Sequence, residues 1–111
     1  MNQTQKVVLV HSLLALSHLP ERRFVGFDGG LCAAGAKAIG VVEADTESGN
    51  VAPANVLGIM LVEAGAAVSA GADVQSDAAG KAIPKDAGLS NGIALDAALA
   101  DGDLIRIVRG I

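Results

Sequence analysis

The sequence predicts an all-β fold, a small glycine-rich β-sandwich or jelly-roll-like barrel with an N-terminal arm. Two observations support this prediction. Fourteen glycines are spread from Gly26 to Gly110, and they leave little room for a helix of three or four turns without a glycine near its middle. Short apolar runs lie between these glycines, which is the pattern of strands joined by tight turns.

A length of 111 residues fits a single domain. In the last apolar run, Ile105 and Ile107 share one face by the two-residue period of a strand, and we expect that face to point into the core. The strands that the pattern predicts cover residues 22–27, 38–43, 56–63, 72–75, 81–83, 92–96 and 104–109.

Residues 1–20 contain no glycine and end at Pro20, so we treat them as an N-terminal arm and residues 21–111 as a single β domain. The periodicity of the arm fits a helix or a strand. We expect its apolar side chains to pack on a neighbouring subunit or another partner. An ordinary first strand in the domain's own sheet is the alternative. The candidate contact residues are Val7, Leu9, Leu13, Leu14 and Leu16.

Composition argues against several other classes of protein. The net charge is −4, and the eight Lys and Arg are scattered, so nucleic-acid binding is not expected. The pair Arg22–Arg23 is expected at a solvated strand edge. The apolar run 7–19 is shorter than the roughly 20 residues that a membrane helix needs, and it does not fit a signal peptide, so we expect a chain made in the cytoplasm. Cys32 is the only cysteine, which predicts a buried, inert thiol.

No catalytic, cofactor-binding or metal-binding residues are predicted, and we expect no enzymatic activity. The stretch 30–37 resembles a phosphate-binding loop, but Ala36 separates the second glycine from Lys37 and no Ser or Thr follows. His11 and His18 have no acidic residue or cysteine near them in sequence, so they do not predict a zinc site. The acids at 101 and 103 flank a glycine, which indicates a turn.

A weak repeat of glycine, apolar run, acid and alanine begins at Gly40, Gly58 and Gly92. The unequal spacings argue against a solenoid. They indicate one strand-and-turn unit that an all-β domain uses more than once. We expect the glycine to permit a close approach of strands and the acid to mark the point where the strand reaches the surface.

The stretch 35–108 resembles the capsid cement proteins of tailed and Mu-like phages, also called head-decoration or minor capsid proteins. The residues that carry the resemblance are 36–42 (AKAIGVV), the Ala-Gly-Ala steps at 64–66 and 70–72, 74–82 (VQSDAAGKA), 92–97 (GIALDA) and 100–107 (ADGDLIRI). The arm does not match this pattern.

The resemblance implies a structural virion protein on the capsid exterior, made in the cytoplasm of the bacterial host, with no catalysis and no cofactor. The implied partners are the major capsid protein and further copies of the chain, with a trimer favoured over a dimer. A small carrier-type or ligand-binding β-barrel is the alternative, and it needs a modifiable lysine on an exposed hairpin. Lys37, Lys81 and Lys85 are the candidates, and none follows a methionine as in that family.

Overall fold

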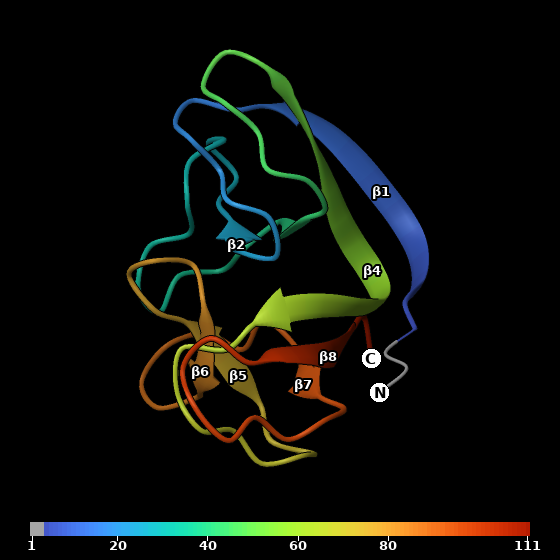
Figure 1. The fold of residues 1–111 in the computed structure, drawn as a ribbon, viewed down its shortest axis with the longest axis vertical. Coiled ribbons are helices and arrows are strands. Elements are labelled where there is room, and N and C mark those ends of the chain that lie inside the picture. Colours follow the sequence, from blue (N-terminus) through green and yellow to red (C-terminus); the bar gives the residue numbers. More distant parts are fainter. Residues whose placement is uncertain (1–3) are drawn as a thin grey trace.

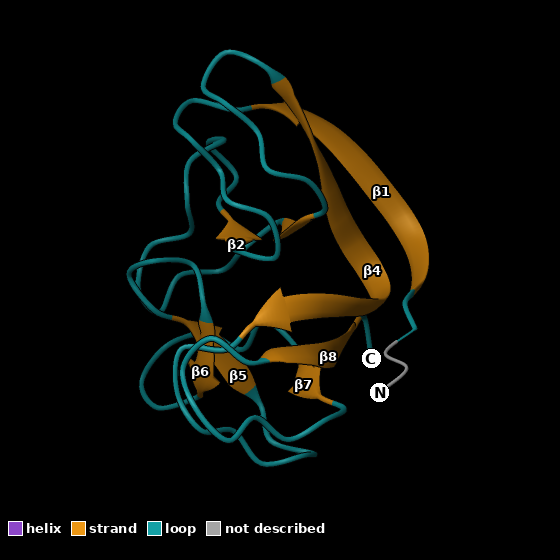
Figure 2. Cartoon of the chain, viewed as in Figure 1, coloured by secondary structure: helices purple, strands orange, loops and turns teal. Residues whose placement is uncertain are grey.

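A computed structural model describes residues 4–111, and this part of the chain contains strands, turns and no helix (Figure 2). The prediction of an all-β fold is confirmed. The strands are β1 (Lys6–Leu14), β2 (Phe24–Val25), β3 (Gly40–Val42), β4 (Val51–Glu63), β5 (Val74–Ser76), β6 (Ala82–Pro84), β7 (Ile93–Ala94) and β8 (Leu104–Arg109).

The main sheet is antiparallel and has the order β2-β3-β4-β8-β7, with β1 also paired to β4. Strands β5 and β6 form a separate hairpin. Figure 1 shows β4 as the long strand that joins the two parts of the molecule, with β1 beside its first part and β8 beside its last. The curled sheet therefore depends on one central strand.

The predicted strands are found, with shifted ends. Strand β8 has the predicted bounds, because a turn precedes it and a glycine follows it. Strand β4 begins at Val51 rather than at residue 56. Pro53 lies inside it, opposite Ser12. Pro53 has no N–H to donate, but its carbonyl oxygen still accepts a hydrogen bond from the Glu43 N–H, at 2.9 Å.

The apolar part of the N-terminal segment is a strand, which decides between the two predicted conformations. Strand β1 pairs with β4 from Lys6 opposite Ile59 to Leu14 opposite Val51. The register shifts on either side of Leu9. Residues 1–3 of the predicted arm lie outside the described residues.

The two halves of the chain repeat one arrangement of strands. Residues Val10 to Leu14 of β1 pair with Asn55 to Val51 of β4. In the same way, residues Ile59 to Glu63 of β4 pair with Val108 to Leu104 of β8. Strand β4 therefore serves as the second strand of the first half and as the first strand of the second half.

The equivalence extends beyond these strands. Val41 of β3 lies opposite Asn55, and Ile93 of β7 lies opposite Val108, the counterpart of Asn55. Two isolated antiparallel bridges, Leu19–Thr46 and Val68–Ala98, also occupy matching places. The predicted repeat is thus real for the units that begin at Gly40 and Gly92. It is wrong for the unit at Gly58, which lies within β4 and has a different role.

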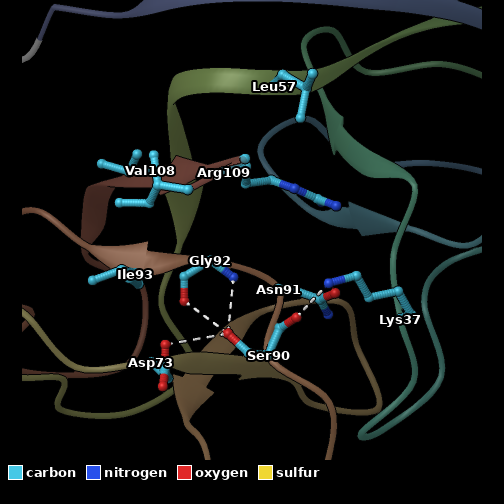
Figure 3. Close-up of a pocket in the computed structure, with 11 residues that line it drawn as sticks. Lys37, Leu57, Asp73, Ser90, Asn91, Gly92, Ile93, Val108 and Arg109 are labelled. Carbon is cyan, nitrogen blue, oxygen red and sulfur yellow. Dashed lines mark hydrogen bonds between the residues drawn. The ribbon is translucent and has the colours of Figure 1, made fainter.

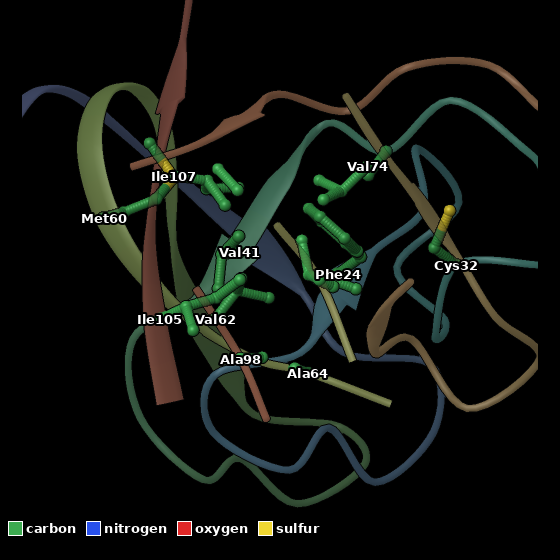
Figure 4. Packing of buried hydrophobic residues seen from close by; sticks show 14 residues of the cluster. Phe24, Cys32, Val41, Met60, Val62, Ala64, Val74, Ala98, Ile105 and Ile107 are labelled. Atoms are coloured by element: carbon green, nitrogen blue, oxygen red, sulfur yellow. The ribbon is translucent and has the colours of Figure 1, made fainter. Parts of the chain in front are cut away.

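The buried side chains form two clusters of small and medium size. Figure 4 shows the larger cluster, in which Ile105 and Ile107 of β8 pack near Met60 and Val62 of β4. Both isoleucines are almost fully buried, which confirms their predicted direction. The smaller cluster belongs to the first half and contains Ala15, Leu19, Val25, Val42, Ala52 and Ala54.

Glycines allow strands to approach closely at two of the predicted positions. A Cβ atom on Gly40 would lie 2.4 Å from the carbonyl oxygen of Asn55, and one on Gly58 would lie 2.3 Å from that of Lys6. Gly58 also has a φ of +110°, which other residues rarely adopt. Both positions therefore require glycine.

The acids of the repeats all form ion pairs with arginines. Glu43 binds Arg22, and Glu63 binds Arg23, whose side chains are only 20% and 18% exposed. The prediction that Arg22 and Arg23 form a solvated edge is wrong, because both side chains are largely buried in ion pairs with acids that are distant in sequence. Asp96 receives two hydrogen bonds of 2.9 Å from the Arg106 guanidinium in the second half.

Candidate functional site

Exposed apolar side chains are concentrated on β1 and in the segments beside it. Leu14 and Val51 lie opposite each other on β1 and β4, where paired residues share one face of the sheet, and they are 56% and 64% exposed. Val8 is 80% exposed. We call this set the β1 patch, and it consists of Val8, Leu9, Val10, Leu14, Leu16 and Val51.

The position of β1 in the sheet explains this exposure. Within residues 4–111, β1 pairs with β4 and with no other strand, so its second edge is open. Two of its apolar side chains reach the interior, because Val7 packs against the larger core cluster and Leu13 against the smaller one. The remaining apolar side chains of β1 are left on the surface.

The five residues predicted to contact a partner therefore lie in two environments. Leu9, Leu14 and Leu16 belong to the β1 patch, whereas Val7 and Leu13 are half-buried against the chain's own core. Sequence reasoning missed three further members of the patch, Val8, Val10 and Val51. The signal for Val8 and Val10 was the unbroken apolar run 7–10, since a strand places such residues on both faces.

The second half shows that the fold does not require apolar residues at these positions. The counterparts of Leu14 and Val51 are Glu63 and Leu104, which pair in the same register. Glu63 binds Arg23 and Lys81, at 3.2 Å each. An apolar pair at the matching place in the first half is thus a property of its surface rather than a need of the sheet.

A hollow of about 360 Å³ lies beside the end of β8 and is lined in part by polar side chains. Figure 3 shows that its polar side chains lie close to the chain's own polar groups. The Lys37 ammonium donates to the Ser90 carbonyl oxygen at 2.8 Å, and the Ser90 hydroxyl donates to Asp73 at 3.3 Å. The Arg109 guanidinium donates to the Ala38 carbonyl oxygen at 2.9 Å, and burial lowers its pKa. Lys37 and Ser90 therefore stabilise the loop, whereas Nη1 of Arg109 is buried without a hydrogen-bond partner among the described residues.

Lys81 and Cys32 also have structural surroundings, whereas Lys85 follows β6 as an exposed residue. Lys81 donates to Asp101 at 2.9 Å and lies 3.2 Å from Glu63, and these two hydrogen bonds raise the pKa of Lys81. Cys32 is buried, as predicted, and its burial raises the pKa of its thiol. A raised pKa reduces the thiolate fraction, so the thiol is a poor nucleophile.

Among the described residues, no helix has the length and apolar character needed to cross a membrane.

Comparison with known proteins identifies the family to which the chain belongs. A family model described as phage cement protein matches residues 2–109, almost the whole chain. The chain belongs to the phage cement protein family. The resemblance found in the sequence is thereby confirmed, and it extends into the N-terminal segment that the sequence pattern had left unmatched.

A solved structure shows the same fold. It is the crystal structure of the N base of head fiber gp8.5 in bacteriophage phi29, with a TM-score of 0.72 and 23% sequence identity. The match covers 90% of this chain and 92% of that chain. No curated protein matches the chain.

Membership of the cement family assigns this chain a structural role in the phage virion, in association with the capsid. It also gives the β1 patch a context. Apolar surface that is rimmed by polar residues typically marks a site of protein–protein contact.

Proposed function

We propose that this chain is a decoration protein that binds the outer surface of a phage capsid and stabilises it by bridging neighbouring shell subunits. In this proposal the β1 patch makes the contact, either with the major capsid protein or with another copy of the chain. In this proposal the chain acts without catalysis and without a cofactor. The single observation that carries it is the open, apolar β1 edge in a chain of the cement family.

The chemistry of β1 suits such a contact. An open strand edge offers backbone N–H and C=O groups to a partner strand, and soluble proteins usually protect such edges with charges, prolines or bulges. Lys6 at the start of β1 is the only charged residue among Lys6–Leu14. The register shift around Leu9 distorts the pairing side, but a run of exposed Val and Leu remains. Both the backbone and the side chains of β1 are thus available for an interface.

Modest contacts of this kind are sufficient on a capsid. A shell presents many identical sites, and a homo-oligomer that engages several of them gains from effective concentration without any new type of contact. We favour a trimer over a dimer, by analogy with the cement family alone.

The proposal is tested with capsids of the phage that encodes this chain, prepared without it. Purified protein is added, unbound protein is removed by sedimentation, and the particles are imaged by electron cryomicroscopy. We expect added density on the outer surface at sites between shell subunits, and a higher temperature of capsid disruption. Capsids that sediment without the protein at micromolar concentration would contradict the proposal. Light scattering of the free protein measures its oligomeric state separately.

A further inference from the structure

The fold brings together three metal-ligating side chains that are distant in sequence. The Nε2 atom of His18 lies 2.5 Å from Oδ1 of Asp45 and 3.9 Å from Oε1 of Glu47. One donor atom from each residue lies within 4.8 Å of the other two. The sequence around His18 did not indicate this cluster, since residues 45 and 47 reach His18 only through the fold.

The backbone that presents these side chains is held firmly. Leu19 and Thr46 exchange two hydrogen bonds, of 2.8 and 2.9 Å, and both residues are buried. His18 directly precedes Leu19, and the two acids directly flank Thr46. The Thr46 hydroxyl also donates to the Ala44 carbonyl oxygen at 2.8 Å. The three donors thus extend from two segments that this bridge holds together.

Comparison of the two halves shows that the fold does not need these three side chains. The equivalent bridge, Val68–Ala98, has hydrogen bonds of 3.0 and 2.9 Å. The residues beside it at the matching positions are Ala67, Ala97 and Leu99, none of which can bind a metal or form an ion pair. The same backbone element therefore forms without the cluster, and the His-Asp-Glu set is a feature of the first half alone.

The charges of the cluster are not balanced by a basic side chain. Among the ion pairs of residues 4–111, Asp45 and Glu47 pair with His18 and with neither a lysine nor an arginine. The three side chains are 50%, 62% and 78% exposed, so an ion can reach them from solvent. Two carboxylates and one imidazole nitrogen form a donor set with a net charge of −2 when the histidine is neutral.

We propose that His18, Asp45 and Glu47 bind one divalent transition-metal ion, with Zn²⁺ as the best match. Zn²⁺ accepts imidazole nitrogen and carboxylate oxygen at about 2.0 to 2.2 Å, and sites with three protein ligands keep a further position open. Small side-chain rotations bring the donors from their present spacing to that geometry. Ca²⁺ fits less well, because it takes six to eight oxygen ligands. The open position is available to water or to a side chain of a partner. This inference does not depend on the proposed function.

The test is isothermal titration calorimetry of the tag-free chain with zinc chloride. We expect binding of one ion per chain, with an affinity reduced at least tenfold (about 1.4 kcal/mol) by His18→Ala. His11→Ala is the matched control and leaves the affinity unchanged, because His11 is an exposed histidine of β1 outside the cluster.

A second variant keeps the test independent of folding. The triple change His18→Ala, Asp45→Ala and Glu47→Leu copies the residues of the second half, so it preserves the backbone element while it removes every donor. We expect it to fold, by circular dichroism, and to bind no zinc. Absence of zinc binding by the unmodified chain would overturn the proposal, and so would unchanged binding by His18→Ala.

Discussion

Leu14 and Val51 face each other across β1 and β4, and each has more than half of its surface exposed. A cross-strand apolar pair in this position stabilises the sheet only modestly while it remains in water. Its counterpart in the second half, Glu63 opposite Leu104, shows that a charged residue is compatible with the same strand geometry. We propose that a partner covers this apolar pair.

The close approach of β1 to β4 predicts that Gly58 does not tolerate a side chain. Gly58→Ala would place a Cβ 2.3 Å from the Lys6 carbonyl oxygen and 2.9 Å from the Val8 nitrogen. Gly49→Ala is the control, since Gly49 also has a positive φ but has open space around it. We expect the control to lose about 1 to 2 kcal/mol from its φ alone and Gly58→Ala to lose clearly more, measured by urea unfolding. Equal losses would show that the strands can separate without cost.

The burial of β8 predicts a large effect at Ile107. Ile107→Asp places a carboxylate among apolar neighbours in the larger core cluster, so we expect a loss of several kcal/mol of unfolding free energy. Leu104→Asp, on the other face of the same strand and 44% exposed, is expected to cost less than about 1 kcal/mol. Thermal melting of the two variants distinguishes these outcomes. Similar melting temperatures would show that the assigned faces of β8 are wrong.

The surroundings of Glu43 predict a contribution to stability that depends on pH. Burial opposes ionisation, but hydrogen bonds from Asn55 and Gln5 and the adjacent Arg22 outweigh it and hold the pKa of Glu43 below its usual value of 4.5. A lowered pKa stabilises the fold fully above pH 4.5, and this contribution is lost as the pH falls through the lowered value.

Glu43→Gln removes this contribution. We expect the variant to be less stable than the unmodified chain at pH 7, and the difference in unfolding free energy to shrink towards pH 3. Glu21→Gln, at an exposed position, serves as the control for the loss of one charge. A difference that stays constant from pH 7 to pH 3 would refute the assignment of the acid effect to Glu43.

The burial of Cys32 predicts a thiol that reacts slowly in the native state. It is 1% exposed, and its raised pKa reduces the thiolate fraction. We expect an aromatic disulfide reagent to modify the native chain at least a hundredfold more slowly than the chain in guanidinium chloride. Rapid modification of the native protein would mean that the segment around Cys32 opens readily.

The sequence predicted local features well and long-range pairing poorly. The bounds of β8 and the faces of Ile105 and Ile107 follow from a two-residue period between a turn and a glycine, which are local signals. The early part of β4, which contains Pro53, was not predicted, although the Pro53 carbonyl still pairs.

The duplication and the cluster of His18, Asp45 and Glu47 depend on contacts between distant residues. Gly40 and Gly92 carried the signal of the duplication, but Gly58 resembles them in sequence and conceals the true spacing. His18 meets Asp45 and Glu47 only because Leu19 pairs with Thr46, a contact that no local pattern indicates. The ion pairs of Arg22 and Arg23 with Glu43 and Glu63 were missed for the same reason.

The most direct test of the proposed capsid contact compares two exposed leucines. Leu14 lies in the β1 patch, and Leu99 lies in the loop between β7 and β8, where it is 86% exposed. Binding of Leu14→Asp and Leu99→Asp to undecorated capsids is measured by co-sedimentation, after circular dichroism has shown that both variants fold. We predict that Leu14→Asp binds at least tenfold more weakly than the unmodified chain and that Leu99→Asp binds normally. Normal binding by Leu14→Asp would contradict the assignment of the β1 patch as the surface that contacts the capsid.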